Sequence, residues 1–193
     1  ILKIGSIIES SIYYKFREHS NISNYLGAHK ENLIHYRTAG GGYWVTFLNE
    51  EFDSDSVSNK FASFRYPFNS KVFSSALNSN LFWWYYSINF DLFNFKDYMI
   101  FGFKMNYPEK HIENKLLKVS EIMESELRNN AEYYVINSKT KGANETVTYR
   151  KDLTKSIMNE IDKVLAKHYG FTEEELDFII NYDIKYRMGS ELN

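Results

Sequence analysis

Residues 157–189 read IMNEIDKVLAKHYGFTEEELDFIINYDIKYRMG, and this stretch decides the fold of the C-terminal part of the chain. Residues there and just before it recur at the spacing of one helix face. These are Leu153, Ile157, Ile161, Val164, Leu165 and His168. Gly170 follows at the position where a helix end favours a residue with positive φ. The repeat therefore predicts an amphipathic helix that ends at Gly170.

A second helix is predicted directly after this glycine. Thr172 is a good N-cap residue, and Glu175 three positions later completes the pattern of a capping box. The two glutamates between them add negative charge near the positive end of the helix macrodipole. We expect this helix to run to about Arg187, so that the chain ends in a helical hairpin.

A longer apolar stripe precedes the hairpin. After Pro108, apolar residues alternate at spacings of three and four, as in antiparallel coiled-coil pairs. The stripe consists of Ile112, Leu116, Val119, Met123, Leu127, Ala131 and Tyr134 or Val135. It predicts one long helix that packs against the two C-terminal helices. Residues 142–149, between the long helix and the hairpin, predict a glycine-containing loop with room for a short strand.

The region before Pro108 has the pattern of strands and loops. Residues 33–37 and 43–47 are β-prone runs. The glycine-rich residues 38–42 between them accept the positive φ that a tight hairpin turn requires. Residues 61–66 alternate weakly in polarity and predict a third strand, which a proline ends.

One more helix completes the predicted architecture. Residues 76–86 are expected to form a helix with a hydroxyl cap and aromatic residues on most faces, so it must be largely buried. The sequence thus predicts an α+β fold. A small mixed or antiparallel-sheet recognition lobe, residues 1–107, is followed by a helical lobe, residues 108–193, with one long helix and a C-terminal helical hairpin. Because the chain begins with isoleucine, we expect a fragment of a longer enzyme.

Composition narrows the class of protein. The chain has 193 residues and no cysteine, which excludes disulfides, thiolate catalysis and cysteine-ligated zinc and is typical of a cytoplasmic protein. No apolar run reaches the roughly 18 residues of a membrane span, so we expect no membrane partner. The aromatic share of 18% predicts a folded domain with a core rich in aromatic residues.

Charge is unevenly distributed along the chain. The net charge of −2 does not favour a uniformly basic nucleic-acid binder. However, the acid-free interval of residues 56–90 contains Lys60, Arg65 and Lys71. Residues 139–155 contain five cations and two carboxylates. These two basic regions are therefore candidate phosphate contacts.

The sequence lacks recognisable catalytic motifs. It has no Asn/Asp-Pro-Pro-Tyr/Phe box of amino-methyltransferases, and its glycines at 40–42 precede a predicted strand rather than a helix. The five histidines are scattered without metal-binding spacing. Asp97 with Glu113 and Lys115 matches a loose nuclease pattern, but the last two lie in the predicted long helix. We therefore expect no catalytic residue, cofactor site or metal site in this chain.

Four segments resemble a known family. The tail, residues 175–189, reads ELDFIINYDIKYRMG, a run that helical periodicity alone does not require. Residues 76–85 read ALNSNLFWWY, residues 91–98 read DLFNFKDY, and residues 36–44 read YRTAGGGYW. They resemble the C-terminal target recognition (specificity) domain of bacterial type II restriction-modification DNA adenine methyltransferases of the fused restriction/methylase kind. The proline that often closes the family's next strand is absent at residues 103–105.

The resemblance implies sequence-specific binding of double-stranded DNA. An upstream methyltransferase domain of the same polypeptide would hold S-adenosylmethionine and flip the target adenine. Arg37 and Arg65 are the candidate base-reading residues, because arginine reads guanine in the major groove. The other candidate DNA contacts are Lys60, Lys71, Tyr43, Lys139 and Lys141. Asn78 and Asn80 are expected to satisfy backbone groups at a helix start instead.

Three alternatives remain open at this point. A type I specificity half has long helices between two recognition lobes, but a single lobe is predicted here. A protein-interaction module would dock a partner subunit through the aromatic helix and the long stripe. Added salt weakens phosphate contacts steeply, because they release counterions, whereas an apolar interface does not depend on salt in this way. An autonomous nuclease would cleave DNA in the presence of divalent metal.

Overall fold

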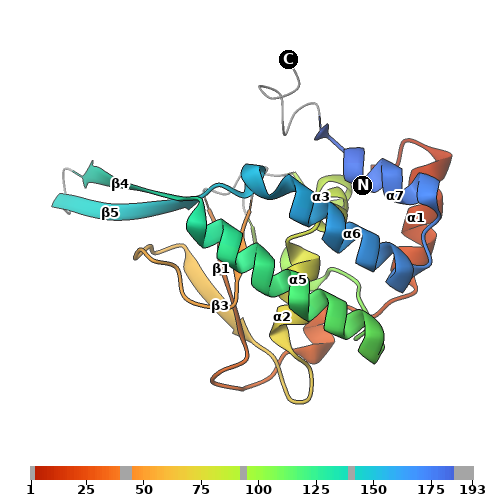
Figure 1. Ribbon diagram of the computed structural model, residues 1–193, viewed down its shortest axis with the longest axis horizontal. Helices are drawn as coiled ribbons and strands as arrows, with labels where there is room; N and C mark the ends of the chain where they lie inside the picture. Colours follow the sequence, from red (N-terminus) through yellow and green to blue (C-terminus); the bar gives the residue numbers. More distant parts are fainter. Residues whose placement is uncertain (1–2, 40–44, 92–94, 139–141, 185–193) are drawn as a thin grey trace.

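The chain is an α+β protein in which helices predominate, as the sequence predicts (Figure 1). A computed structural model describes residues 3–39, 45–91, 95–138 and 142–184. Helices cover a small three-stranded sheet, and a two-stranded arm projects from the body (Figure 1). Within these ranges, no helix is both long and apolar enough to cross a membrane.

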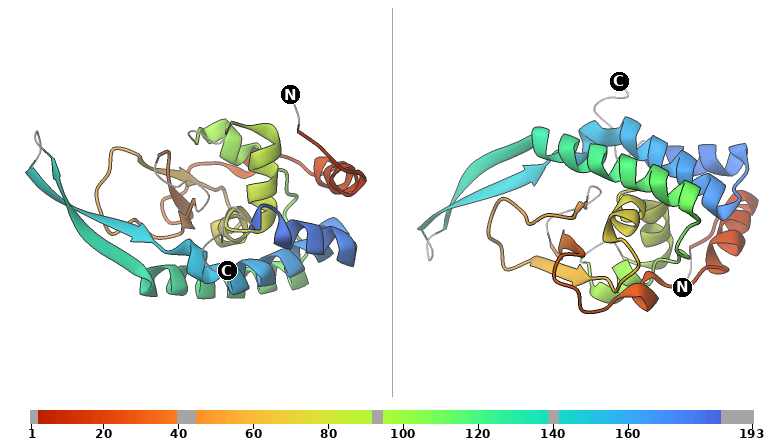
Figure 2. Two further views of the ribbon diagram at one scale, coloured as in Figure 1. Left: turned by 90° about the horizontal axis from the view of Figure 1, so that it is seen from above. Right: turned by 60° about the horizontal axis from the view of Figure 1, so that its bottom comes forward.

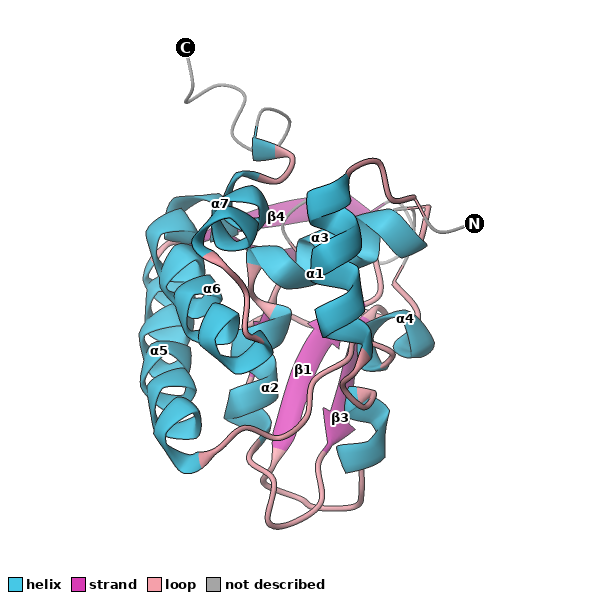
Figure 3. Ribbon diagram, turned by 90° about the vertical axis from the view of Figure 1, so that its right-hand side faces the viewer, coloured by secondary structure: helices cyan, strands magenta, loops and turns pink. Residues whose placement is uncertain are grey.

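Two long helices form the outer layer. α5 (Lys110–Asn129) and α6 (Lys155–Tyr169) run side by side, and α2 (Ser70–Leu77) packs against both (Figure 2). α1 (Ile7–Arg17) and α7 (Glu173–Asn181) lie together at one end of the molecule (Figure 3). α3 (Asn80–Asn89) follows α2 in the chain, and the remaining short helical segments are η1 (Ile22–Tyr25), α4 (Asp97–Phe101) and η3 (Lys151–Thr154).

The predicted turn of the C-terminal hairpin is confirmed. Gly170 has a φ of 69° and closes α6. Thr172 and Glu175 form the reciprocal capping box that begins α7. α7 ends at Asn181, earlier than the expected helix end, and residues 185–193 lie outside the described part.

The buried face of α6 differs from the predicted one. Leu153, expected on that face, precedes the helix and is 50% exposed. The buried residues of the helix are Met158, Ile161, Asp162, Leu165, Ala166 and Tyr169. The face is wider and rotated because α6 contacts α2, α3, α5 and α7. A buried aspartate within it was not expected from the apolar repeat.

An antiparallel sheet with the strand order β2-β1-β3 forms the other layer. β1 is Leu33–Arg37, β2 is Phe47–Leu48 and β3 is Asn59–Ser63. The first two strands pair in antiparallel fashion as predicted, with His35 opposite Leu48, but β2 begins only at Phe47 and does not cover the predicted residues 43–47. Because Tyr36 lies opposite Phe47, residues 37–46 connect the paired positions in place of the predicted turn over residues 38–42, of which residues 40–42 lie outside the described part. The third strand begins and ends earlier than predicted, because Phe64 leaves it to form an isolated bridge with Leu26.

The prediction of a single helix over residues 76–86 is wrong. The chain forms α2 and then α3 (Asn80–Asn89), which begins at the cap residue Ser79. Between the helices, the Asn78 side chain accepts from the N–H of Phe47 at 3.2 Å and donates to its carbonyl at 2.7 Å. This contact ties the helix pair to β2, and such a distant partner leaves no trace in local propensity.

The predicted long helix is shorter than expected. α5 ends at Asn129, and β4 (Ala131–Ser138) pairs with β5 (Gly142–Tyr149) to form the antiparallel arm. Residues 133–135, expected at the end of the helical stripe, are β-favouring and pair with residues 145–147. The spacing of these residues fits both the helical period of about 3.6 residues and the strand period of about 2 residues. The apolar stripe alone therefore does not distinguish a helix from a strand here. Residues 142–149, predicted to be a glycine-containing loop with a short strand, form β5 over their whole length and contain no loop.

One hydrophobic core crosses the predicted boundary between residues 107 and 108. Its buried side chains extend along the chain from Ile12 to Ile179. Polar contacts cross the boundary as well: the Ser75 hydroxyl donates to the Leu116 carbonyl at 2.9 Å. The sheet and the helical layer are therefore held in a fixed relation, and so are the surfaces they carry.

Candidate nucleic-acid interface

The open edge of the sheet carries one predicted phosphate contact, Lys60. In the antiparallel register, Lys60 of β3 lies opposite Tyr36 of β1. The Lys60 ammonium is 3.3 Å from an Asp97 carboxylate oxygen, which also accepts from the Tyr36 hydroxyl at 2.9 Å. Because the Lys60 side chain is 48% exposed, this ion pair contributes little to stability. A phosphate can compete for the ammonium.

Arg37, predicted to read a base, is engaged inside the protein. Its guanidinium donates to the side chains of Asn59 (2.9 Å) and Ser54 (2.8 Å) and to the carbonyl of Val147 (2.9 Å). It also lies 4.5 Å from the centre of the Phe52 ring. Burial lowers the pKa of Arg37. A base contact would require these bonds to break, so the geometry favours a structural role: Arg37 ties the sheet to the base of the arm.

Replacing Arg37 by alanine is expected to lower the free energy of unfolding by about 2 kcal/mol, because three polar groups lose a charged donor. The loss should also loosen β5, since Ser54 bonds the Val147 N–H at 3.2 Å. Urea unfolding measures the first effect, and hydrogen exchange of the Val147 amide measures the second. Lys60→Ala, which breaks only an exposed pair, is the control. Wild-type stability and exchange in Arg37→Ala would return Arg37 to the base-reading candidates.

Arg65 and Lys71 lie on the surface after β3. Arg65 is exposed, and its guanidinium carbon is 5.6 Å from the centre of the Phe68 ring. Lys71 is 3.2 Å from Glu121 of α5 and 42% exposed. Of the four predicted cations within the described ranges, Arg65 is the one whose side chain has no hydrogen-bonded or ionic partner there, although its backbone bonds Tyr25 and Phe68. It is therefore the predicted base reader that the geometry continues to support.

The other three predicted contacts, Tyr43, Lys139 and Lys141, lie outside the residues that the structure describes. In the sequence the two lysines fall between Ser138 and Gly142, which are the last paired residues of the arm. Contact of these three residues with DNA stays a prediction.

One carboxylate fixes the base of the arm to the body. Asp53 accepts from the hydroxyls of Tyr133 (2.9 Å) and Tyr149 (3.1 Å) and pairs with Arg128 at 2.9 Å. Tyr133 of the arm is nevertheless 62% exposed, and Val135 further along is 55% exposed. The arm is thus anchored where it leaves the body and presents large side chains to a partner beyond that point.

A cavity of about 490 Å³ opens beside β3. It is lined by Ala28, His29, Lys30, Leu33, Phe61 and Ser63. Sequence reasoning missed three candidate functional residues here. Phe61 was assigned only to a strand, and no local pattern brings His29 and Lys30 against it. The signal that was present is the place of Phe61 in a strand with an exposed face.

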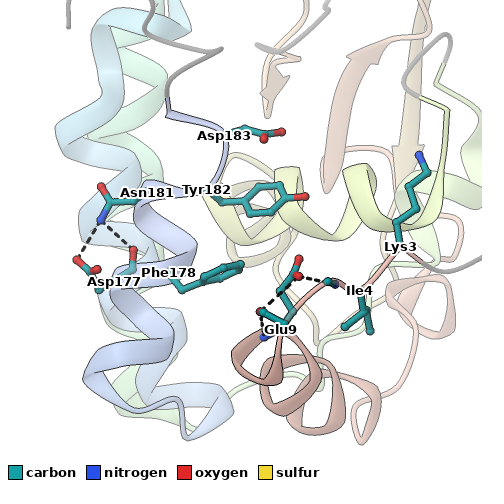
Figure 4. Close-up of a pocket in the computed structure, with 10 residues that line it drawn as sticks. Lys3, Ile4, Glu9, Asp177, Phe178, Asn181, Tyr182 and Asp183 are labelled. Carbon is teal, nitrogen blue, oxygen red and sulfur yellow. Dashed lines mark hydrogen bonds between the residues drawn. The ribbon is translucent and has the colours of Figure 1, made fainter.

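A larger cavity, of about 810 Å³, lies between the start of α1 and the end of α7, at the opposite end of the molecule from the arm (Figures 1 and 4). Its charged lining residues are Lys3, Glu9, Asp177 and Asp183. The Lys3 ammonium donates to the Phe90 carbonyl at 2.8 Å. Because carboxylates outnumber the ammonium in this lining, the cavity is unfavourable for phosphate.

The residues of the loose nuclease pattern have separate partners. Asp97, at the start of α4, bonds Tyr36 and Lys60. Glu113, in the first turn of α5, accepts from the Tyr107 hydroxyl at 2.9 Å and pairs with a neighbouring lysine. Within the described residues, no three His, Cys, Asp or Glu side chains come together as a metal-binding group.

Comparison of the chain with protein-family models, with curated proteins and with solved structures finds no match. The structural features that bear on function are the projecting arm, the open edge of β3 with its exposed cations, and the cavity beside that edge.

Proposed function

We propose that the chain is the DNA-recognition domain of a bacterial restriction-modification adenine methyltransferase. Its arm and the open edge of β3 bind double-stranded DNA. The observation that carries this proposal is the arm, a two-stranded antiparallel ribbon that projects from the body (Figure 1). The major groove of B-DNA admits such a ribbon, and several DNA-binding proteins use one. The resemblance of four sequence segments to this family supports the same conclusion.

The distribution of charge agrees with DNA binding at the arm and the sheet. Lys139 and Lys141 fall between the two strands of the arm in the sequence, where they would meet phosphates on either side of a groove. Lys60 and Arg65 lie at the sheet, and the acidic cavity lies at the other end of the molecule. Phosphate contacts need only charge, whereas base contacts need a directed donor. We assign Arg65 to the second role.

In this proposal an upstream domain of the same polypeptide carries the chemistry and holds S-adenosylmethionine. The two described links from a strand into a helix, residues 64–69 and 150–154, contain no glycine. They do not fit the glycine-rich strand-to-helix turns that let a backbone approach a nucleotide cofactor. The chain's own residues position the DNA for that domain. The proposal places the protein in the cytoplasm, where its DNA would be.

Selection from a pool of random duplexes tests this proposal. We expect the chain to retain duplexes with one shared short motif at low salt and to release them steeply as salt rises. Replacing Lys139 and Lys141 together by alanine should reduce the slope of log K against log salt by about 2 without changing the motif. Arg65→Ala should relax the motif at one position. Lys163→Ala, on α6 and paired with Glu160, is the matched surface control.

A docking module is the second candidate, favoured by the exposed tyrosines and valine of the arm. Such a surface would bind a partner protein with little dependence on salt. Folded protein that retains no duplex at any salt would replace the DNA proposal by this one. Equal retention of duplexes of all sequences would support DNA binding but contradict sequence-specific recognition.

A further inference from the structure

The cavity beside β3 is built as a fixed feature of the sheet end. The Gly27 N–H donates to the Ser63 carbonyl at 2.9 Å, and the Arg65 N–H donates to the Tyr25 carbonyl at 3.0 Å. At Gly27 the backbones approach so closely that a Cβ would lie 2.7 Å from the Arg65 Cβ. Glycine permits this approach, and the loop that follows it forms one wall of the cavity.

The other wall is an aromatic ring. Phe61 is 64% exposed, and its neighbours on the same face of the sheet, Leu33 and Ser63, line the cavity with it. The volume of about 490 Å³ falls within the roughly 300–1,000 Å³ typical of small-ligand sites. An exposed ring over an apolar floor suits a flat ligand that stacks on it.

One cation lies at the rim of the cavity. Lys30 lines the cavity beside His29, and both side chains are exposed. The His29 Nδ1 accepts from the Glu31 N–H at 3.4 Å, which leaves the Nε2 side of the ring for another partner. Flat ligands with an attached anion therefore match both parts of the site, the ring and the rim.

The strand edge adds hydrogen-bonding groups. Phe64 N–H bonds Asn32, and Thr38 N–H bonds the Ser58 carbonyl, so the backbone groups of even-numbered residues in β3 face β1. The N–H and C=O of Phe61 consequently point away from β1, along the open edge. Among the described residues no group bonds them. They offer one donor and one acceptor beside the ring.

From these features we infer that the cavity binds a single unpaired nucleobase together with its phosphate. The base stacks on Phe61, and the phosphate meets Lys30. Stacking on an aromatic side chain is tolerant of base identity, so shape and charge rather than sequence decide binding. The inference rests on the proposed function where DNA is the source of the base, although a free nucleotide has the same chemistry.

Fluorescence of 2-aminopurine tests the inference. The probe is placed unpaired in a single-nucleotide bulge of a duplex, fully paired in a matched duplex, or supplied as the free 2-aminopurine nucleoside monophosphate. We expect the full chain to change the emission of the bulged base and to bind it in preference to the paired one. Binding of the free nucleotide would identify a soluble ligand, and binding of the bulge alone would identify the DNA strand as the source.

Three variants connect the signal to the ring. Phe61→Ala should bind the bulged probe about tenfold more weakly, the size expected for one base–aromatic stack, and Phe61→Tyr should restore binding. Tyr66→Ala, which removes another exposed ring at 84% exposure, is the control and should bind as the wild type does. Both substituted positions are exposed, so folding should be unaffected in all three variants.

Two outcomes separate this inference from the proposed function. Equal response of the wild type and Phe61→Ala to both bulge and free nucleotide, with duplex binding intact, overturns the base site alone. A Phe61-dependent response to the free nucleotide, with no binding of any duplex, supports the base site and overturns the DNA-recognition function.

Discussion

Replacing Asp162 by alanine is expected to lower the free energy of unfolding by about 4 kcal/mol, the size typical of removing one partner from a buried charged network. Asp162 is 2% exposed and lies on the inner face of α6. Its carboxylate accepts from the N–H of Asn80 (3.1 Å), the N–H of Leu81 (3.0 Å) and the amide of Asn80 (2.6 Å). Alanine would remove the shared acceptor of these three donors, of which the Asn80 amide also bonds Asn159 at 3.3 Å.

The position of these donors makes the loss large. Asn80 and Leu81 form the first turn of α3, whose first N–H groups have no partner within the helix. The carboxylate also favours that turn through the helix macrodipole. α3 is buried along almost its whole length, so a disturbed start displaces core side chains. Each unsatisfied buried donor costs about 1–3 kcal/mol.

Urea unfolding of Asp162→Ala, Asp162→Asn and Asp177→Ala measures this effect. For a chain of this size, 4 kcal/mol corresponds to a fall in Tm of about 8–16 °C. Asparagine keeps one acceptor and should lose less than alanine. Asp177 is an exposed carboxylate on α7 that bonds only its neighbour in the next turn, Asn181, and should lose less than about 1 kcal/mol. A loss in Asp162→Ala no larger than in this control would contradict the account.

Asp162 and His168 are expected to make opposite contributions to the pH dependence of the free energy of unfolding. Burial raises the pKa of Asp162 to about 6, although Asn80, the Leu81 N–H and Lys155 lower it in part. Burial, together with a smaller effect of the nearby His19, whose ring centre is 4.9 Å away, lowers the pKa of His168 to about 4. The His168 Nε2 is buried without a hydrogen-bond partner in the described part. The two groups therefore bind protons differently in the folded and unfolded chain.

The signs of the two contributions are opposite. Between about pH 4 and 6 the folded chain keeps a proton on Asp162 that the unfolded chain has lost, so this group destabilises the fold as pH rises. Between about pH 4 and 6.5 the unfolded chain keeps a proton on His168 that the folded chain has lost, so this group stabilises the fold as pH rises. Near pH 5 each slope is about 1 kcal/mol per pH unit. The contributions of these two groups nearly cancel.

Substitution separates the two slopes. Relative to the wild type, the free energy of unfolding of Asp162→Asn should rise more steeply with pH, and that of His168→Gln should rise less steeply or fall. The double variant should return to the wild-type slope. Urea unfolding at half-unit steps from pH 4 to 6.5 measures all four proteins. Parallel curves of the free energy of unfolding against pH for the wild type and both single variants would contradict the opposite contributions of Asp162 and His168.

The sequence predicts elements whose signals are local. The C-terminal hairpin depends on the positive φ of Gly170 and on the capping box between Thr172 and Glu175, and both are confirmed. The break at Asn78 was missed because it depends on Phe47, a partner 31 positions away. The arm was missed in part because residues 133–135 satisfy helical and strand spacing equally well. Elements that depend on local signals are predicted, whereas breaks that depend on distant partners are missed.

The candidate site divides in the same way. Charge along the sequence finds Lys60 and Arg65, which the structure places on the surface. Arg37 has the right residue type in the right strand, but tertiary contacts turn it inward. The cavity beside Phe61 joins residues about 30 positions apart, and no pattern in one sequence records that meeting. Buried Asp162 is hidden for the same reason, since its partners begin another helix.

The way the arm joins the body makes it a lever. One residue, Asn130, separates α5 from β4, and Arg150 alone separates β5 from η3 and the start of α6. A load at the tip is therefore transmitted as torque into the two longest helices of the described part, with Asp53 near the fulcrum. Binding of a ligand at the tip would therefore strain the helical layer that covers the core. A rigid domain attached to that layer would be displaced by this strain.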